Sequence, residues 1–282
     1  MKIIRSISEV IELARNIRKD GNSLGLVPTM GCLHEGHKSL IKKAVENNDK
    51  VIVSIFVNPI QFGPDEDYET YPRTLEADAK LCEEIGADYI FHPDPNQMYP
   101  EGFNTFVVPS DKMTNILCGV SRPGHFRGVC TVLTKLFTLI KPDRAYFGEK
   151  DIQQLAIVKR MIKDLNFDIE IIGCPIIRED DGLAKSSRNT YLNEEERAAA
   201  TVLRRSILEG KKAIDSGNLS KEEVLKIIKN VIEKERLAKI DYVEIIDFDT
   251  FDQVETINNN TLIAMAVYIG KTRLIDNMVI KL

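Results

Sequence analysis

The feature that most constrains the fold is an alternation of two kinds of segment along the first ~180 residues. Short apolar runs rich in β-branched residues, such as "LGLVPT", "VIVSIFVN", "DYIFHP", "RAYFG" and "IEIIGCPIIR", are typical of strands buried on both faces of a parallel sheet. Segments with helical periodicity lie between them, including "HKSLIKKAVENN", "TLEADAKLCEEIGA" and "GVCTVLTKLFTLIKP". The alternation predicts an α/β fold with a doubly wound, Rossmann-like parallel sheet over residues 1–180.

The pattern changes after "REDDGLAKSSRNTYL". Two helical stretches, Glu194–Ser216 and Lys221–Lys239, precede the strand-like runs "DYVEIIDF", "LIAMAVYIG" and "TRLIDNMVIKL". Gly270 and Lys271 separate the last two runs and predict an antiparallel hairpin. We therefore expect a smaller α+β domain over residues 181–282.

Charge and hydropathy exclude several classes of partner. The formal net charge of -5 argues against nucleic acid, because phosphate backbones bind concentrated basic surfaces. The apolar runs are far shorter than the roughly 20 residues that span a bilayer, and the N-terminal stretch lacks the apolar core of a signal peptide. The five cysteines form no C-x-x-C pair, which favours reduced thiols. We expect a cytoplasmic protein with no membrane partner.

The stretch "PTMGCLHEGHKSLI" joins an apolar run to a helical run and holds two of the four histidines. Gly31 and Gly36 would let the backbone approach an anion at the N-terminus of the helix, where free N–H groups point. There the imidazoles of His34 and His37 could stabilise charge at phosphorus. A helical metal pair is usually spaced i, i+4 and needs a third ligand. Alone, the stretch leaves a phosphate site and a plain turn with surface histidines equally open.

Two further stretches carry polar groups at expected strand-to-helix junctions. Asn58 and Gln61 follow a buried run, and their amides could recognise a small polar ligand or satisfy a local turn. The acidic run Asp65–Asp67 indicates a solvated loop rather than a metal site. Arg122 and His125 in "RPGHFRGV" belong to a basic cluster that could contact an anion or lie on a surface loop.

Each of the last two stretches also allows both a binding role and a structural role. In "YFGEKDIQQL", Gly148 allows close approach, Lys150 supplies a positive charge, and Asp151 could bind a ribose hydroxyl or cap a helix. In "GLAKSSRNTYL", two hydroxyls followed by an arginine could clamp a polyphosphate, or the run could be a polar linker. The sequence contains neither a Walker-A motif nor G-x-G-x-x-G.

Taken together and in this order, the stretches resemble the pantoate–β-alanine ligase family, also called pantothenate synthetases, of the HIGH-type nucleotidyltransferase superfamily. The resemblance extends through "SIFVNPIQFGPDEDYETYPRT" and "PDRAYFGEKDIQQL" to the closing "TRLIDN" and covers essentially the whole chain. It implies ATP-dependent condensation of (R)-pantoate with β-alanine to pantothenate through a pantoyl adenylate, with release of AMP and pyrophosphate. It also implies Mg²⁺ with the ATP, no tightly bound organic cofactor, a lid-like C-terminal domain and a homodimer.

The resemblance assigns roles to the matching positions. The implied catalytic residues are His37, His34, Lys150 and Arg188. The implied ATP-binding residues are Met30, Gly31, Cys32, Leu33, His34, Glu35, Gly36, His37, Gly148, Glu149, Lys150, Asp151, Ile177, Lys185, Ser186, Ser187 and Arg188. The implied pantoate and β-alanine contacts are Gln61, Gln154, Asn58 and His125, and the implied magnesium contact is Asp78. Lys185 departs from the family, which often has methionine there.

Three other interpretations remain open at this stage. A nucleotidyltransferase with another acceptor, such as a cytidylyltransferase, would release a different nucleotide product. A nucleotide-binding module without catalysis would show a ligand-dependent melting shift and no turnover. A metal hydrolase built on H-x-x-H would carry zinc.

Overall fold

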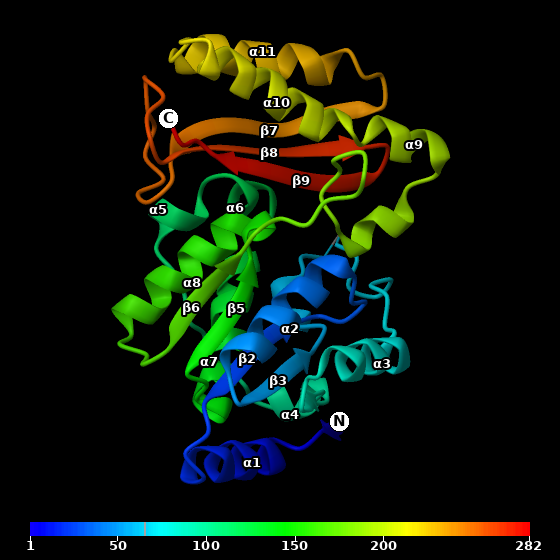
Figure 1. Cartoon of the computed structure of the whole chain (residues 1–282), viewed down its shortest axis with the longest axis vertical. Coiled ribbons are helices and arrows are strands. Elements are labelled where there is room, and N and C mark those ends of the chain that lie inside the picture. The colour runs from blue at the N-terminus through cyan, green and yellow to red at the C-terminus, as the bar shows by residue number, and fades with distance from the viewer. Residues whose placement is uncertain (65) are drawn as a thin grey trace. The chain divides into compact units, whose positions relative to one another are not determined.

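The computed structural model describes residues 1–64 and 66–282 (Figure 1). The chain forms two compact units. The first unit comprises Met1–Asp111 and Arg122–Pro175, and the second comprises Lys112–Ser121 and Ile176–Leu282. The periodicity of the sequence places the change of pattern near residue 180 and carries no signal that residues 112–121 pack with the second unit.

A six-stranded parallel sheet forms the centre of the first unit, with the order β1-β4-β3-β2-β5-β6. The strands are β1 (Lys2–Ile4), β2 (Leu24–Thr29), β3 (Lys50–Ile55), β4 (Tyr89–Phe91), β5 (Arg144–Gly148) and β6 (Glu170–Cys174). The central strands β2 and β3 are buried along nearly their whole length, as their continuous apolar runs predict. The predicted doubly wound parallel sheet is confirmed.

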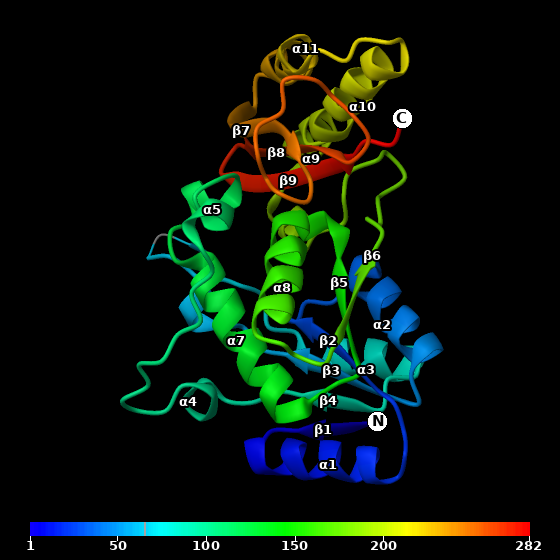
Figure 2. The same cartoon turned by 90° about the vertical axis from the view of Figure 1, so that its left-hand side faces the viewer.

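Helices cover both faces of this sheet (Figure 2). Those of the first unit are α1 (Ile7–Lys19), α2 (Glu35–Asn47), α3 (Leu75–Ile85), α4 (Pro95–Met98), α7 (His125–Ile140) and α8 (Ile152–Asp164). The helices α2 and α3 pack together on one face, whereas α7 packs with α1 and α8 on the other. Gly86 ends α3 in the left-handed conformation at φ +96°, which a glycine adopts without strain.

The strand order reverses between β2 and β5. From β2 the chain proceeds through β3 to β4 in one direction, and then it returns to place β5 on the other side of β2. At such a switch point the loops after the two strands diverge, and ligands of doubly wound sheets bind there. The loop that follows β2 carries His34, and the turn that follows β5 carries Lys150.

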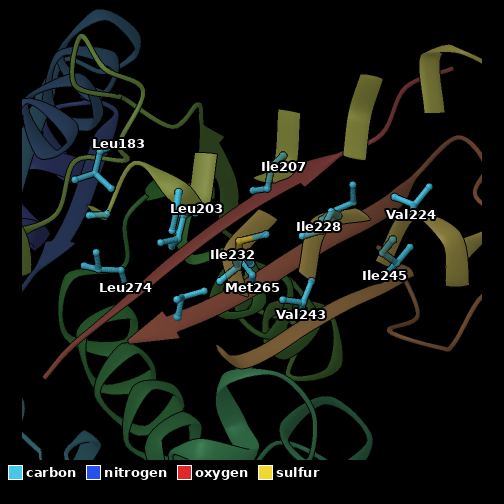
Figure 3. Packing of buried hydrophobic residues seen from close by; sticks show 14 of the residues in the cluster. Leu183, Leu203, Ile207, Val224, Ile228, Ile232, Val243, Ile245, Met265 and Leu274 are labelled. Atoms are coloured by element: carbon cyan, nitrogen blue, oxygen red, sulfur yellow. The ribbon is translucent and has the colours of Figure 1, made fainter. Parts of the chain in front are cut away.

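The second unit is an antiparallel sheet of three strands with helices packed on it. Its main elements are α9 (Glu194–Ala199), α10 (Val202–Asp215), α11 (Lys221–Glu233), β7 (Ala238–Asp247), β8 (Thr261–Ile269) and β9 (Thr272–Val279). The short helices α5 (Asp111–Thr114) and α6 (Cys118–Ser121) lie in its first segment, except for Asp111, which belongs to the first unit. Its core joins the apolar faces of α10 and α11 to the sheet, with Ile228 and Met265 among the buried residues (Figure 3). The predicted α+β arrangement is confirmed.

Two helix bounds differ from those predicted. The stretch Glu194–Ser216 is broken between α9 and α10 at Ala200 and Thr201, and the next helix ends at Glu233 rather than Lys239. It ends early because residues from Ala238 onward pair with β8. The predicted turn at Gly270 and the hairpin of β8 and β9 are confirmed. Within the described residues, no helix is long and apolar enough to cross a membrane.

Candidate active site

The loop between β2 and α2 is held in a tight turn. The Thr29 hydroxyl donates to the carbonyl of Ser54 at 2.7 Å and accepts from the backbone N–H of Gly31 at 3.2 Å. Gly31 has φ +88°, and a Cβ there would lie 3.1 Å from both Asp78 and Ile55. A glycine is therefore required for the loop to turn away from the sheet at this point.

Asp78 of α3 anchors the same loop. Its carboxylate is 2% exposed and accepts from the backbone N–H of Cys32 at 3.0 Å and of Leu33 at 2.8 Å. The hydroxyl of Thr74 donates to it as well, at 3.2 Å. These bonds give Asp78 a structural role that the sequence analysis missed. Across residues 1–64 and 66–282, no three His, Cys, Asp or Glu side chains converge to form a metal site.

The two histidines form a reciprocal cap at the start of α2. Nδ1 of His34 accepts from the backbone N–H of Gly36 at 3.1 Å, and Nδ1 of His37 accepts from the backbone N–H of His34 at 3.3 Å. A backbone N–H can only donate, so each ring carries its proton on Nε2. The ring centroids are 4.1 Å apart. The helix thus begins with two imidazoles whose Nε2–H groups are donors.

The surroundings of His37 keep it uncharged. Burial lowers its pKa to about 3, and the neighbouring His34 and the positive charge of Lys150 act in the same direction. Lys150 comes from the turn after β5 and lies 3.7 Å from the carboxylate of Asp151. Two neutral donors and one cation therefore occupy the switch point, which is a suitable arrangement for phosphate oxygens.

Gly148, the last residue of β5, has no steric reason within the protein to be glycine. Its φ of −77° suits any residue, and a Cβ built there would meet no atom of the described residues within 4 Å. The space beside it is open, so a ligand can approach the backbone. Gln154 lies half-buried in the first turn of α8, which begins just beyond.

Asn58 and Gln61 form a buried amide pair after β3. Nδ2 of Asn58 donates to Oε1 of Gln61 at 3.0 Å and to the carbonyl of Gly128 at 3.1 Å. Nε2 of Gln61 lies 3.0 Å from the sulfur of Met30 in the histidine loop. Both amides are buried, with 1% and 9% of their surface exposed. The amide pair is therefore continuous with the loop that carries the histidines.

His125 supports this pair from the start of α7. Its Nδ1 donates to the carbonyl of Gln61 at 2.9 Å, and its Nε2 accepts from Arg122 at 3.1 Å. Burial lowers the pKa of His125 to about 4, and the charge of Arg122 acts in the same direction. Arg122 also forms a two-pronged ion pair with Glu66. In this basic cluster, for which the sequence left an anion contact and a surface loop equally open, the charge of Arg122 is thus compensated by Glu66. Asp65 of the acidic run lies outside the described residues.

Of the other predicted residues, Glu35 begins α2 and Glu149 begins the turn after β5, both in the first unit. The last five, Ile177, Lys185, Ser186, Ser187 and Arg188, lie in the second unit, in the segment after β6. The backbone N–H of Lys185 donates to the carbonyl of Ile177 at 2.9 Å, and its ammonium pairs with Glu179. Ser186 accepts from the backbone N–H of Arg188 at 3.3 Å and begins a 3₁₀ turn that contains the buried Ser187. The sequence left the role of Lys185 open, and in the structure its ammonium is paired with the carboxylate of Glu179.

Arg178 and Asp276 hold the base of this loop. Two N–H groups of Arg178 donate to the two carboxylate oxygens of Asp276, each at 2.8 Å, and one of them also reaches the carbonyl of Gly182 at 3.0 Å. Asp276 is 2% exposed. Sequence reasoning missed this pair, and the only signal for it was an acidic residue inside the apolar run "TRLIDNMVI".

Comparison with known proteins identifies the family. The family model described as "Pantoate-beta-alanine ligase" matches residues 2–279. The chain belongs to the pantoate–β-alanine ligase family. A pantothenate synthetase from Ruminiclostridium cellulolyticum is 62% identical over 277 residues, which cover 98% of each chain. One from Clostridium botulinum is 58% identical over 282 residues, and the match covers 100% of both chains.

Solved structures of pantoate–β-alanine ligases share the fold. The pantothenate synthetase of Thermus thermophilus is 41% identical with a TM-score of 0.94, and the match covers 99% of both chains. The ligase of Francisella tularensis, in a complex with β-γ ATP and β-alanine, is 39% identical with a TM-score of 0.82, and the match covers 99% of this chain and 97% of that ligase. The chain is thus an enzyme of the pantoate–β-alanine ligase type.

Proposed function

We propose that this enzyme condenses (R)-pantoate with β-alanine to form pantothenate, and that ATP is cleaved to AMP and pyrophosphate through a pantoyl adenylate. The observation that carries the proposal is the contact of Gln61 with Met30, because it joins a phosphate-type site to a buried site for a small polar ligand. The Francisella tularensis relative supports it, since that protein is described with an ATP analogue and β-alanine together.

In the first step a carboxylate oxygen of pantoate attacks the α-phosphorus of ATP, and the bond to the pyrophosphate oxygen breaks. Such a transfer needs alignment and charge stabilisation more than a covalent nucleophile. We assign the Nε2–H groups of His34 and His37 to phosphate oxygens, where they donate without having to lose a charge. Lys150 supplies the positive charge, and Gly148 and Asp151 are assigned to the ribose side.

In the second step the amine of β-alanine attacks the acyl carbon of the adenylate. The new amide bond forms, AMP leaves with the electrons of the broken bond, and the nitrogen gives up a proton. We assign Gln61 and Gln154 to pantoate, with Asn58 and His125 holding Gln61 in place. A mixed anhydride hydrolyses readily, so water must be kept from it while the amine arrives.

The loop of the second unit is assigned to the outer phosphates. Ser186, Ser187 and Arg188 combine hydroxyl donors with a guanidinium, which binds phosphate oxygens bidentately. Ile177 is assigned to the base of the nucleotide. We assign Lys185 a smaller part in phosphate binding, because its ammonium pairs with the carboxylate of Glu179. The lid-like role that the family resemblance implies for the C-terminal domain stays a prediction.

Magnesium is proposed to enter with the substrate as Mg-ATP. Mg²⁺ commonly keeps several waters and is held by substrate phosphates with one or two carboxylates. The family resemblance implies Asp78 as the magnesium contact. Its carboxylate already accepts hydrogen bonds from two backbone N–H groups and from the hydroxyl of Thr74. We therefore expect at most an indirect contact from it.

A homodimer and a cytoplasmic location stay predictions. Sedimentation at micromolar concentration tests whether the protein is a homodimer.

Isotope exchange between pyrophosphate and ATP tests the proposed function. With pantoate present and β-alanine omitted, exchange that requires pantoate would establish the adenylate step. Addition of β-alanine should then lower the rate of exchange, because the amine competes with pyrophosphate for the adenylate, and should release AMP and pantothenate in equal amounts. Absence of both exchange and AMP formation would overturn the proposed substrate, whereas AMP formation without exchange would overturn only a freely reversible first step.

A further inference from the structure

A line of hydrogen bonds leads from Tyr99, the residue that ends α4, to the amide of Gln61. The hydroxyl of Tyr99 donates to Oδ1 of Asn58 at 2.7 Å. Nδ2 of Asn58 donates to Oε1 of Gln61 at 3.0 Å, and Nε2 of Gln61 reaches the sulfur of Met30 at 3.0 Å. All four residues belong to the first unit.

The chemistry of the partners fixes the direction of this line. An amide side chain can usually be turned over without a visible difference in shape. Here the carbonyl of Gly128 can only accept, so the atom of Asn58 that lies 3.1 Å from it is the nitrogen. Its second proton bonds to Oε1 of Gln61. Oδ1 of Asn58 then needs a donor, and the hydroxyl of Tyr99 provides one.

We propose that Tyr99 is a positioning residue that acts through Asn58 to keep the nitrogen of Gln61 turned toward the substrate. With Oε1 of Gln61 occupied by Asn58, the end that faces the histidine loop is the N–H₂ group. The site therefore donates to a carboxylate or hydroxyl oxygen of the acid substrate. This inference rests on the proposed function for the identity of that acid, but not for the direction of the bonds.

Loss of the Tyr99 hydroxyl would remove the donor to Oδ1 of Asn58 and leave the amide direction held from the other side, by the carbonyl of Gly128. Asn58 is 1% exposed, so Oδ1 without a donor would be an unsatisfied buried acceptor. A shift of Asn58 toward another donor would loosen the bond from its Nδ2 to Oε1 of Gln61. Gln61 would then be free to turn its own oxygen toward the substrate. An oxygen there repels a carboxylate, so binding of the acid should weaken.

The ring of Tyr99 is held independently of its hydroxyl. Its centroid lies 5.0 Å from that of Phe103 and 6.2 Å from that of Phe56, and the ammonium of Lys135 lies 5.9 Å from it. A phenylalanine keeps all of these contacts, so Tyr99→Phe should fold. Tyr146→Phe is a matched control: Tyr146 is fully buried in the same unit and its hydroxyl accepts from Asn48 at 2.8 Å.

Steady-state kinetics of the full-length enzyme test the proposal first. Tyr99→Phe is expected to raise KM for pantoate about tenfold and to leave KM for ATP within about twofold. Tyr146→Phe should change neither. In the Gln61→Ala background, Tyr99→Phe should have no further effect on pantoate, because it acts through Gln61. An equal effect with and without Gln61 would overturn the proposal in favour of a general structural role.

The side-chain amide signals in a nitrogen–proton NMR spectrum give a readout that needs no substrate. We expect Tyr99→Phe to shift the N–H₂ signals of Asn58 and Gln61, and Tyr146→Phe to shift that of Asn48 instead. Unchanged Gln61 signals would overturn the role of Tyr99. If the wild type shows neither pantoate-dependent exchange nor AMP formation, the proposed substrate is wrong, and the NMR comparison still decides whether Tyr99 orients Gln61.

Discussion

The backbone N–H of His34 donates to Nδ1 of His37 across 3.3 Å, and this bond decides which ring nitrogen of His37 carries the proton. Because Nδ1 is an acceptor, Nε2 keeps its hydrogen and is the only donor that the ring can offer to a ligand. With the pKa of His37 lowered to about 3, the ring stays neutral throughout the physiological range. The start of α2 therefore provides oriented dipoles in addition to the charge of Lys150.

Replacement of His37 tests this role directly. His37→Ala should lower kcat by roughly 10²–10³, because a donor aimed at developing charge is lost. His37→Gln, which can restore a donor of similar reach, should recover part of the rate. Since the pKa of His37 is about 3, protonation of His37 should not lower the wild-type kcat at mildly acidic or neutral pH. An unchanged kcat in His37→Ala would remove His37 from the mechanism.

Asp78 should behave as an anchor of the loop. Asp78→Ala leaves the backbone N–H groups of Cys32 and Leu33 without their buried acceptor, at a cost of about 1–3 kcal/mol each. Asp78→Asn keeps one acceptor oxygen and should be milder in urea unfolding. The Mg²⁺ concentration for half-maximal activity should stay the same in Asp78→Asn. A strongly increased requirement for Mg²⁺ would instead support a metal contact.

Cys32 should be dispensable and slow to react. Burial raises the pKa of its thiol, and the carboxylate of Asp78 raises it further, so little thiolate forms at neutral pH. Cys32→Ala should keep its activity within about twofold, because only the backbone N–H of residue 32 is used by Asp78. Alkylation by iodoacetamide at neutral pH should be slower than that of a free cysteine. A large loss of activity in Cys32→Ala would refute this passive role.

The main strands and helices were predictable because each of them carries its own periodic signal, whereas the short helices α4, α5 and α6 do not. Buried parallel strands appear as unbroken apolar runs, and Gly86 and Gly270 mark a helix end and a turn through local chemistry. The early end of α11 was not predictable in this way. The helical pattern continues past Glu233, and only the pairing of Ala238 with Ile269 in a distant strand ends it.

The candidate site was predictable as a set of positions at strand ends, but its internal contacts were not. His34, Gln61 and Lys150 each follow a strand, and the parallel sheet collects them at one edge. The partners that orient them come from segments with no signal of their own. Neither Asp78 beneath the histidine loop nor Tyr99 behind the amide pair can be inferred without knowing which helices lie against which loops.

The ion pair of Lys185 with Glu179 predicts a small role for this lysine. Both side chains are half-buried, and the charge of Lys185 is already compensated. Lys185→Met, which restores the residue common in the family, should leave KM for ATP within about threefold. Arg188→Ala should lower kcat/KM by roughly 100-fold or more, as expected for loss of a phosphate contact. Equal losses in the two variants would show that Lys185 also reaches the phosphates.

His125 should make the stability of the protein sensitive to acid. Its pKa is about 4 in the folded protein, below the value near 6.5 of an unfolded chain. As the pH falls from about 7 to about 4, His125 takes up a proton in the unfolded chain but stays neutral in the folded protein. The free energy of unfolding therefore decreases over this range of pH. The contribution is roughly 2–3 kcal/mol, because the ring is only 8% exposed and cannot be solvated when charged.

Urea unfolding at several pH values checks this. We compare the free energy of unfolding of the wild type and of His125→Gln at about pH 7.5, 6 and 5, which run from above the unfolded pKa into the window between the two pKa values. The wild type should lose more stability than the variant as the pH falls, because carboxylates common to both proteins cancel in the difference. His92→Gln, which removes another histidine of the same unit, controls for a general effect. Parallel curves for the wild type and His125→Gln would show that His125 accepts a proton in the folded state, and its bond from Arg122 would then have to break.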